Sequence, residues 1–259
     1  MRLAPFHWWR TVFYLIPAIS VYTIILGTLS ISSSLFDRRG FFAHRCARLW
    51  AHLILRTTGV TVRASGVERL DPSTSYVLAS NHQSIYDIPV IFDTMPLQLR
   101  IVAKASLGSF PFLGWHLRRT GHVLVQRDNP GAGVFKRMAR LVGDGVSLIV
   151  FPEGTRSRDG GVARFKGGPF LIAIDAGLPV VPVSVSGSRH VMRKGRVMTC
   201  PGAVDLTVHE PIPTKDLTRE DARALADRVR AIVARAVQTD DAPAADAPGA
   251  VLGASPTQD

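Results

Sequence analysis

An uncharged stretch of 26 residues, Thr11–Phe36, dominates the start of this chain. As a helix, its most apolar part, Val12–Leu29, would extend about 27 Å, close to the roughly 30 Å hydrocarbon core of a bilayer. We therefore expect the segment to enter a membrane, either by spanning it or, because Pro17 interrupts it, as a tilted or re-entrant helix. A cleaved signal peptide is the alternative. It is disfavoured because the apolar run is long and no small-residue cleavage site follows closely.

A second helix is predicted over residues 41–56, where apolar residues such as Phe42, Leu49 and Trp50 recur at helical spacing and basic residues gather on another face. This pattern is typical of a helix that lies among lipid head groups, although an ordinary helix packed on a core gives the same pattern. Five arginines within residues 38–56 predict that this side of the membrane is the cytoplasmic one.

The charge of the chain predicts anionic partners. The net charge is +11, and residues 240–259 contain four Asp and no basic residue, so the remainder carries +15. Such a body favours acidic lipid head groups, phosphorylated compounds or nucleic acid. Nucleic acid is not expected, because the basic cluster at residues 189–196 lacks interleaved aromatic residues and a known binding motif. Cys46 and Cys200 have neither metal-site nor disulfide spacing, which fits a reducing compartment.

From residue 59 onward, short apolar runs alternate with helical patterns. Strands that are apolar throughout indicate an α/β fold with a covered, mostly parallel or mixed sheet flanked by helices. We expect membrane-anchoring helices over residues 1–58, the α/β domain over 59–239 and a disordered tail over 240–259. The expected strands are Val60–Val62, Tyr76–Ala79, Arg100–Ala103, His122–Gln126, Leu148–Phe151, Val180–Val185 and Asp205–His209. The expected helices are Ile88–Asp93, Ala132–Leu141, Phe170–Ala176 and Arg219–Ala236.

The first candidate site follows the strand that ends at residue 79 and reads Asn81-His82-Gln83-Ser84-Ile85-Tyr86-Asp87. A histidine at a strand end and a carboxylate five residues later can form a general base and the group that orients it. Because five residues do not align on one helical face, His82 should precede the helix and Asp87 should lie in its first turn. Ser84-x-x-Asp87 is equally a helix capping box.

The second candidate site, Phe151-Pro152-Glu153-Gly154-Thr155-Arg156-Ser157, follows another apolar strand. Gly154 permits a close backbone approach, Thr155 offers a hydroxyl and Arg156 offers a planar fork suited to phosphate. Glu153 is unexpected in a simple anion site, so we expect it to fix the arginine or the loop by hydrogen bonding. A polar turn with a solvated arginine is the alternative.

Two further cations end predicted strands. Lys104 closes one strand and Arg127 follows the next, so both can converge on one anion at the sheet edge, although either alone is more often a surface charge. Between them, residues 110–115 are unusually apolar for a connection. This stretch is interpreted as a lip against the bilayer, a lid over an acyl chain or part of the core.

These motifs together carry a resemblance. The Asn81–Asp87 motif, Gly121…Arg127, the Phe151–Ser157 motif and Val181-Pro182-Val183 occur in this order at sensible distances. The sequence resembles the glycerolipid acyltransferase family, and most closely its 1-acylglycerol-3-phosphate O-acyltransferase branch, over residues 40–210. Gln126 stands directly before Arg127, where an acidic or amide residue is expected.

The resemblance implies an acyl transfer to the sn-2 hydroxyl of lysophosphatidic acid, giving phosphatidic acid for phospholipid synthesis. His82 would be the base that deprotonates the acceptor hydroxyl and Asp87 the residue that orients it. The acyl donor would be an acyl-ACP or acyl-CoA thioester, with no other cofactor and no metal. The substrate-binding residues expected from the motifs and the resemblance are Lys104, Arg127, Glu153, Gly154, Thr155 and Arg156.

The expected partners are the lipid bilayer, lysophosphatidic acid and acyl carrier protein or coenzyme A. The expected location is the inner membrane of a bacterial-type cell, with the catalytic domain on the cytoplasmic face. Alternatives within the family are glycerol 3-phosphate or another lyso-lipid as acceptor. Outside it, the alternatives are a non-enzymatic basic membrane-binding protein and a serine hydrolase using Ser84 or Ser157, which the missing Gly-x-Ser-x-Gly motif disfavours.

Overall fold

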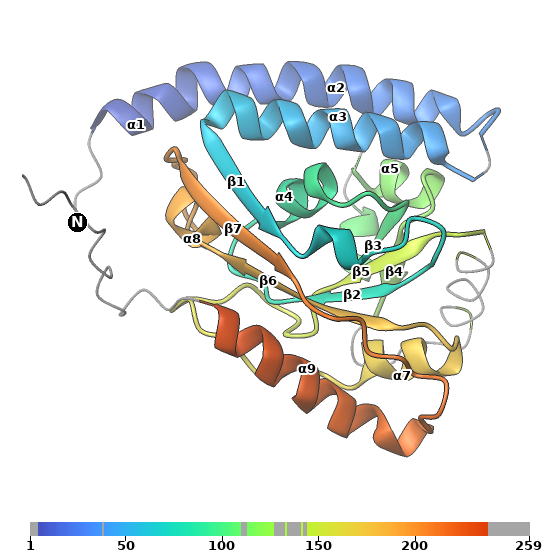
Figure 1. Cartoon of the computed structure of the whole chain (residues 1–259). Helices are drawn as coiled ribbons and strands as arrows, with labels where there is room; N and C mark the ends of the chain where they lie inside the picture. The colour runs from blue at the N-terminus through green and yellow to red at the C-terminus, as the bar shows by residue number, and fades with distance from the viewer. Residues whose placement is uncertain are drawn as a thin grey trace, which may run out of the picture.

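The computed structural model describes residues 5–37, 39–109, 113–126, 133, 141 and 144–237. This part of the chain forms a seven-stranded sheet in the order β1-β7-β6-β2-β5-β3-β4 (Figure 1). The strands are β1 (Val60–Ser65), β2 (Val77–Ser80), β3 (Leu99–Lys104), β4 (Val123–Val125), β5 (Ser147–Val150), β6 (Val180–Ser186) and β7 (Gly202–Val208).

The sheet is mixed but mostly parallel. Each neighbouring pair is parallel except β6 and β7, which run antiparallel. Every residue of β2, β5 and β6 is buried, because helices cover both faces of the sheet there. The predicted α/β class is therefore confirmed. The ends of each predicted strand lie within three residues of the ends of the corresponding observed strand.

Two apolar layers cover the sheet. On one face, α3 (Phe41–Thr58) and α4 (Asp87–Thr94) pack against side chains such as Leu78 of β2. On the other face, α7 (Gly168–Asp175) and α9 (Ala222–Ala236) pack against Val77 and Ala79 of β2, the residues on either side of Leu78 in the sequence (Figure 1). This alternation is the two-residue period of a strand buried on both sides.

Two short helices were not predicted, α5 (Leu113–Arg119) and α8 (Ser188–Val191). Both have too few residues to display a helical period in the sequence. Of the predicted helix at 132–141, only residues 133 and 141 are among the described residues. Single 3₁₀ turns occupy Val67–Arg69, Ala105–Ser109 and Arg219–Asp221.

Most of the uncharged segment lies within one N-terminal helical run. It consists of α1 (Pro5–Arg10), a π turn over Thr11–Leu15 and α2 (Ile16–Ser33), and the stretch Phe6–Ser33 is long and apolar enough to cross a membrane. The expected interruption at Pro17 is wrong. The proline lies in the first turn of α2, directly after the π turn, and such local π adjustments accommodate the hydrogen bond that a proline cannot donate.

α2 and α3 run side by side along one side of the molecule (Figure 1). Trp50 of α3 donates a hydrogen bond from Nε1 to Thr23 Oγ1 of α2, at 2.8 Å. One face of α3, including Ala51 and Leu55, belongs to the core of the α/β domain. Leu49 on another face is 49% exposed, so α3 has both the packed face and the exposed apolar residues that the two interpretations of its pattern required.

Candidate active site

The two candidate motifs meet at one edge of the sheet. His82 follows the end of β2, and the loop from Phe151 to Ser157 follows the end of β5. Since β2 and β5 are neighbouring parallel strands, their carboxyl ends lie at the same edge, where ligands gather in α/β sheets. The contacts between the motifs are direct: the Ser157 amide donates to the His82 carbonyl at 2.7 Å.

His82 and Asp87 form a close pair. Nδ1 of His82 lies 2.7 Å from Oδ2 of Asp87, whose side chain is fully buried at the first residue of α4. Because the carboxylate accepts the hydrogen bond, Nδ1 is the donor, and in the neutral imidazole this leaves the lone pair on Nε2. Within the described part of the chain, Nε2 makes no hydrogen bond. The ring stacks on Phe151, with centroids 4.1 Å apart, so its orientation is fixed from two sides.

The Asp87 carboxylate is held by three further donors. The amides of Gln83 and Ser84 donate to Oδ2 at 2.8 and 3.0 Å, and the hydroxyl of Ser188 donates to Oδ1 at 2.5 Å. The capping box that Ser84-x-x-Asp87 would allow is not formed, because the N-cap of α4 is Tyr86 without a side-chain cap and Ser84 Oγ donates to the Met192 carbonyl. A carboxylate with four donors cannot rotate freely, which fixes the imidazole as well.

Glu153 holds the second motif against His82. Its Oε1 accepts from the His82 amide at 2.8 Å and its Oε2 from the Ala163 amide at 3.1 Å. Burial raises the pKa of Glu153, while the two amide donors act to lower it. The expectation that this residue fixes the loop agrees with these contacts. Its hydrogen-bond partners are backbone amides and not Arg156.

The rest of the motif borders a pocket. Gly154 has φ of +77°, a left-handed conformation that favours glycine. Thr155 and Arg156 line the pocket together with Lys194, whose ammonium donates to Thr155 Oγ1 and to the Arg156 carbonyl, each at 2.8 Å. Glu153 lies at the same pocket, so the cations and the histidine loop share one edge of the sheet.

The other two cations expected at the site are Lys104 and Arg127. Lys104 ends β3, which pairs with β5, and its side chain is exposed. Its ammonium makes no hydrogen bond or ion pair with the described residues. Arg127 lies outside the described residues, as do residues 110–112 of the apolar connection. Trp115 of that connection is 70% exposed on α5.

One segment was not predicted to belong to the site, residues 188–194, which the sequence shows only as part of a basic cluster. Besides the Ser188 and Lys194 contacts, Arg189 donates to the Arg158 carbonyl at 2.8 Å, and the carbonyl of Met192 accepts from Ser84 Oγ at 2.7 Å. The segment therefore holds both motifs from one side. The sequence signal for this segment was the pair Gly187-Ser188 directly after a predicted strand, which indicates a turn at the sheet edge. In the structure Gly187 has φ of +85°, and a Cβ there would lie 2.6 Å from the Ala203 carbonyl oxygen.

The serine-hydrolase alternative receives no support from this geometry. Ser84 Oγ donates to Met192, and Ser157 Oγ donates to Asp159 Oδ1 at 2.8 Å. Within the described part of the chain, neither hydroxyl contacts His82. Pro182 of the fourth motif is buried inside β6, so in this fold it belongs to the architecture of the sheet.

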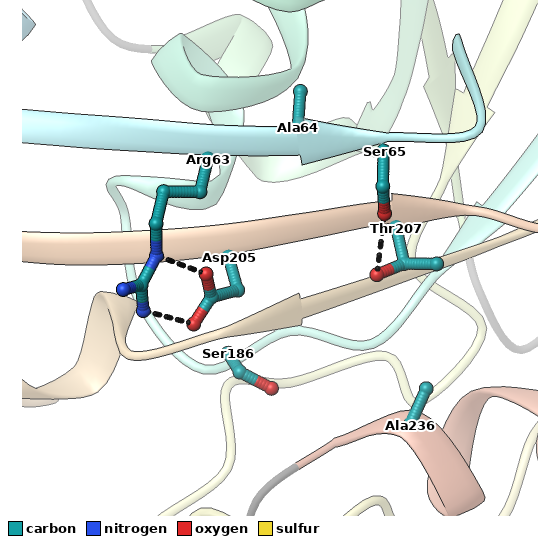
Figure 2. A pocket seen from close by; sticks show the side chains of 7 residues that line it. All are labelled: Arg63, Ala64, Ser65, Ser186, Asp205, Thr207 and Ala236. Atoms are coloured by element: carbon teal, nitrogen blue, oxygen red, sulfur yellow. Dashed lines mark hydrogen bonds and ion pairs between the residues drawn. The ribbon is translucent and has the colours of Figure 1, made fainter. Parts of the chain in front are cut away.

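A second pocket lies away from both motifs. It is bordered by β1, β7 and the end of α9, and Figure 2 shows its side chains. Arg63 and Asp205 form a bidentate pair there at 2.6 and 2.7 Å, and Ser65 donates to Thr207. Because these groups satisfy one another, the pocket offers no free charge to a ligand, and we place the candidate active site at the His82 edge.

Comparison with known proteins identifies a family for the domain that carries these motifs. Residues 61–186 match the sequence model of the family described as Acyltransferase. The chain therefore contains a domain of the acyltransferase family. Within it, the chain resembles 1-acyl-sn-glycerol-3-phosphate acyltransferases. It is 37% identical over 196 residues to the chloroplastic enzyme BAT2 of Brassica napus, covering 73% of this chain and 56% of that protein.

Two further relatives point the same way. The chain is 34% identical over 178 residues to 1-acyl-sn-glycerol-3-phosphate acyltransferase alpha of Homo sapiens, covering 66% of this chain and 62% of that one. The crystal structure of the 1-acyl-sn-glycerophosphate (LPA) acyltransferase PlsC from Thermotoga maritima matches with a TM-score of 0.69 at 29% identity, covering 87% of this chain and 95% of that one. The chain thus spans a little over half the length of these curated plant and human relatives.

Proposed function

We propose that this protein transfers a fatty acyl group from an acyl thioester to the sn-2 hydroxyl of 1-acylglycerol 3-phosphate, giving phosphatidic acid. The observation that carries the proposal is the His82–Asp87 pair, whose free Nε2 lies on the same sheet edge as the pocket of Arg156 and Lys194. The names of the relatives supply the acceptor class.

The mechanism follows from the fixed imidazole. His82 Nε2 takes the proton of the acceptor hydroxyl as the oxygen attacks the thioester carbonyl. Asp87 keeps Nδ1 protonated and stabilises the imidazolium that forms. The C–S bond then breaks, the proton passes from Nε2 to the departing sulfur, and a free thiol leaves. The acyl group passes directly to the acceptor, so no enzyme nucleophile and no cofactor other than the thioester is required.

The acceptor phosphate is proposed to bind at Arg156 and Thr155, with Gly154 allowing close approach and Lys104 and Arg127 as further contacts. Arg156 makes no ion pair with the described residues, so its fork is available to a phosphate. Glu153 serves by holding this loop on His82. The acyl donor is proposed to be acyl-ACP or acyl-CoA, since both carriers are anionic and the body of the protein is strongly basic.

The helical run Phe6–Ser33 is proposed to attach the protein to the inner membrane of a bacterial-type cell, with the site on the cytoplasmic face. Its aromatic side chains Trp8, Trp9 and Phe13 are largely exposed, as a lipid-facing surface requires. α2 runs along α3, which is itself packed on the domain, and this favours a helix that lies tilted along the protein over one that leaves it to span the bilayer.

The test is acyl transfer by the purified full chain in nanodiscs. Lysophosphatidic acid, glycerol 3-phosphate and lysophosphatidylcholine are offered as acceptors, each with acyl-ACP and with acyl-CoA. We expect phosphatidic acid from lysophosphatidic acid, and a loss of kcat of about 10²–10⁴-fold in His82→Ala. Asp87→Asn should lose a similar factor, because the carboxylate no longer stabilises the imidazolium.

The chain supplies a matched control. His52 and Asp93 form a second His–Asp pair, with Nδ1 and Oδ1 3.2 Å apart, on the exposed side of α3 and α4. His52→Ala should keep the wild-type rate. Acylation of only another lyso-lipid would preserve the chemistry and contradict the acceptor. No transfer with any acceptor would leave the alternative of a non-enzymatic membrane-binding protein.

A further inference from the structure

We propose that Lys194 binds the phosphate of the acceptor beside Arg156, as a specificity-determining cation supplied from outside the two motifs. The inference rests on the proposed function, because it names a further residue of the same site. Lys194 belongs to the segment that connects α8 with β7, about 40 residues after Arg156 in the sequence.

The contacts of Lys194 place its ammonium beside residues 155 and 156 of the second motif. Nζ donates to Thr155 Oγ1 and to the Arg156 carbonyl, each at 2.8 Å. Both acceptors belong to the motif that closes on His82 through Glu153 and Ser157. An ammonium has three donors, so one remains for a ligand. The side chains of Lys194 and Arg156 line the same pocket. A phosphate bound there can accept the third hydrogen bond of the Lys194 ammonium.

The charge of the ammonium is not neutralised by the fold. Within the described part of the chain, no carboxylate forms an ion pair with Lys194 or Arg156. The two acids at the same pocket are bound to other groups: Glu153 accepts from the amides of His82 and Ala163, and Asp159 accepts from the Ser157 hydroxyl and the Gly161 amide. Lys194 and Arg156 share this pocket without an ion pair to either carboxylate, so the two cations repel each other, and a dianionic phosphate between them removes that repulsion.

A purely structural role would not require a cation. Two neutral oxygens can be bridged by an amide or hydroxyl side chain at a lower desolvation cost than by an ammonium. The neighbouring basic residues provide the contrast. Arg193 and Arg196 are exposed and make no side-chain hydrogen bond to the motif among the described residues. Lys194 is thus the member of this basic cluster whose contacts reach the motif through Thr155 and Arg156.

The test separates binding from turnover. Binding of glycerol 3-phosphate, the acceptor head group without its acyl chain, is measured by phosphorus NMR titration of the full chain in detergent. The variants are Lys194→Gln, Lys194→Arg and the matched control Arg196→Gln. Because Lys194→Gln removes the proposed charge-assisted hydrogen bond to the phosphate, we expect it to weaken binding about ten- to hundredfold. Lys194→Arg should restore most of the affinity, and Arg196→Gln should match the wild type.

Kinetics with lysophosphatidic acid supply the second readout. Lys194→Gln should raise KM by a similar factor and change kcat by no more than about twofold. The proposal is overturned if Lys194→Gln binds glycerol 3-phosphate as the wild type does, whether or not kcat falls, because the residue then only supports the loop. It is also overturned if Arg196→Gln weakens binding equally, which would indicate diffuse surface charge. If the binding pattern is as expected but no lysophosphatidic acid is acylated, the proposed function fails and the phosphate site stands.

Discussion

The hydroxyl of Ser188 donates a hydrogen bond to the carboxylate of Asp87, although 101 positions separate the two residues in the sequence. Both side chains are fully buried, so no water can replace the donor if it is lost. Ser188 does not touch a substrate in this arrangement. It acts on the reaction through Asp87 and, through Asp87, on the orientation of the His82 ring.

Removing this hydroxyl should therefore lower turnover without affecting binding. We expect Ser188→Ala to reduce kcat about tenfold, because one of the charge-assisted hydrogen bonds that fix Asp87 disappears. KM for the acceptor should stay unchanged. Ser188→Thr, which keeps the hydroxyl, should recover most of the rate. An unchanged kcat in Ser188→Ala, measured under the assay conditions above, would show that three donors suffice to hold the carboxylate.

The carboxylate of Glu153 should matter mainly for the stability of the loop. Glu153→Gln retains one acceptor oxygen and places an NH₂ group against the second of the two amides that the carboxylate now serves. We expect a loss of about 1–3 kcal/mol in the free energy of unfolding and a fall in activity. Thermal unfolding checks the first expectation. Glu68→Gln, at an exposed glutamate, should change neither quantity.

Acid sensitivity is expected from a buried histidine outside the motifs, His44 of α3. Burial, with the charges of Arg100 and Arg48, lowers the pKa of His44 to about 4. The unfolded chain then binds its proton more tightly than the folded protein does, so stability falls as the pH drops from about 6.5 towards 4.

The corresponding test is His44→Phe, which removes the titrating group and keeps an apolar ring next to Phe92. Between pH 7.5 and pH 5, the wild type should lose roughly 2 kcal/mol more of its free energy of unfolding than the variant does. Urea unfolding at the two pH values measures the difference. His116, whose pKa is also lowered, is present in both proteins and affects them equally. If the wild type and the variant lose the same free energy of unfolding, the assignment to His44 is contradicted.

Membrane attachment should depend on the aromatic side chains at the start of the helical run. A triple variant of Trp8, Trp9 and Phe13 to Ser exposes less apolar area to lipid and should shift most of the protein from sedimented vesicles to the supernatant. Arg228→Ser on α9, across the sheet from α2 (Figure 1), is the control and should sediment as the wild type does. Equal sedimentation of the triple variant would place the attachment elsewhere.

The sequence alone determined the strands, the order of the motifs and the apolar character of the N-terminal segment. Each of these depends on local information: apart from serines, the residues of β2, β5 and β6 are apolar, and the spacing of His82 and Asp87 allows only a histidine before a helix and an aspartate in its first turn. Short helices such as α8 escaped because four residues carry no periodic signal.

Only the tertiary structure decided which distant groups complete the site. Ser188 and Lys194 reach Asp87 and Arg156 because β6 lies beside β2, an adjacency created by pairing between strands about a hundred residues apart. The same holds for Pro17, which interrupts a helix by its local preference but is tolerated here after a π turn. Local sequence fixes what each residue can do chemically, while sheet pairing and packing across the core fix which residues do it together.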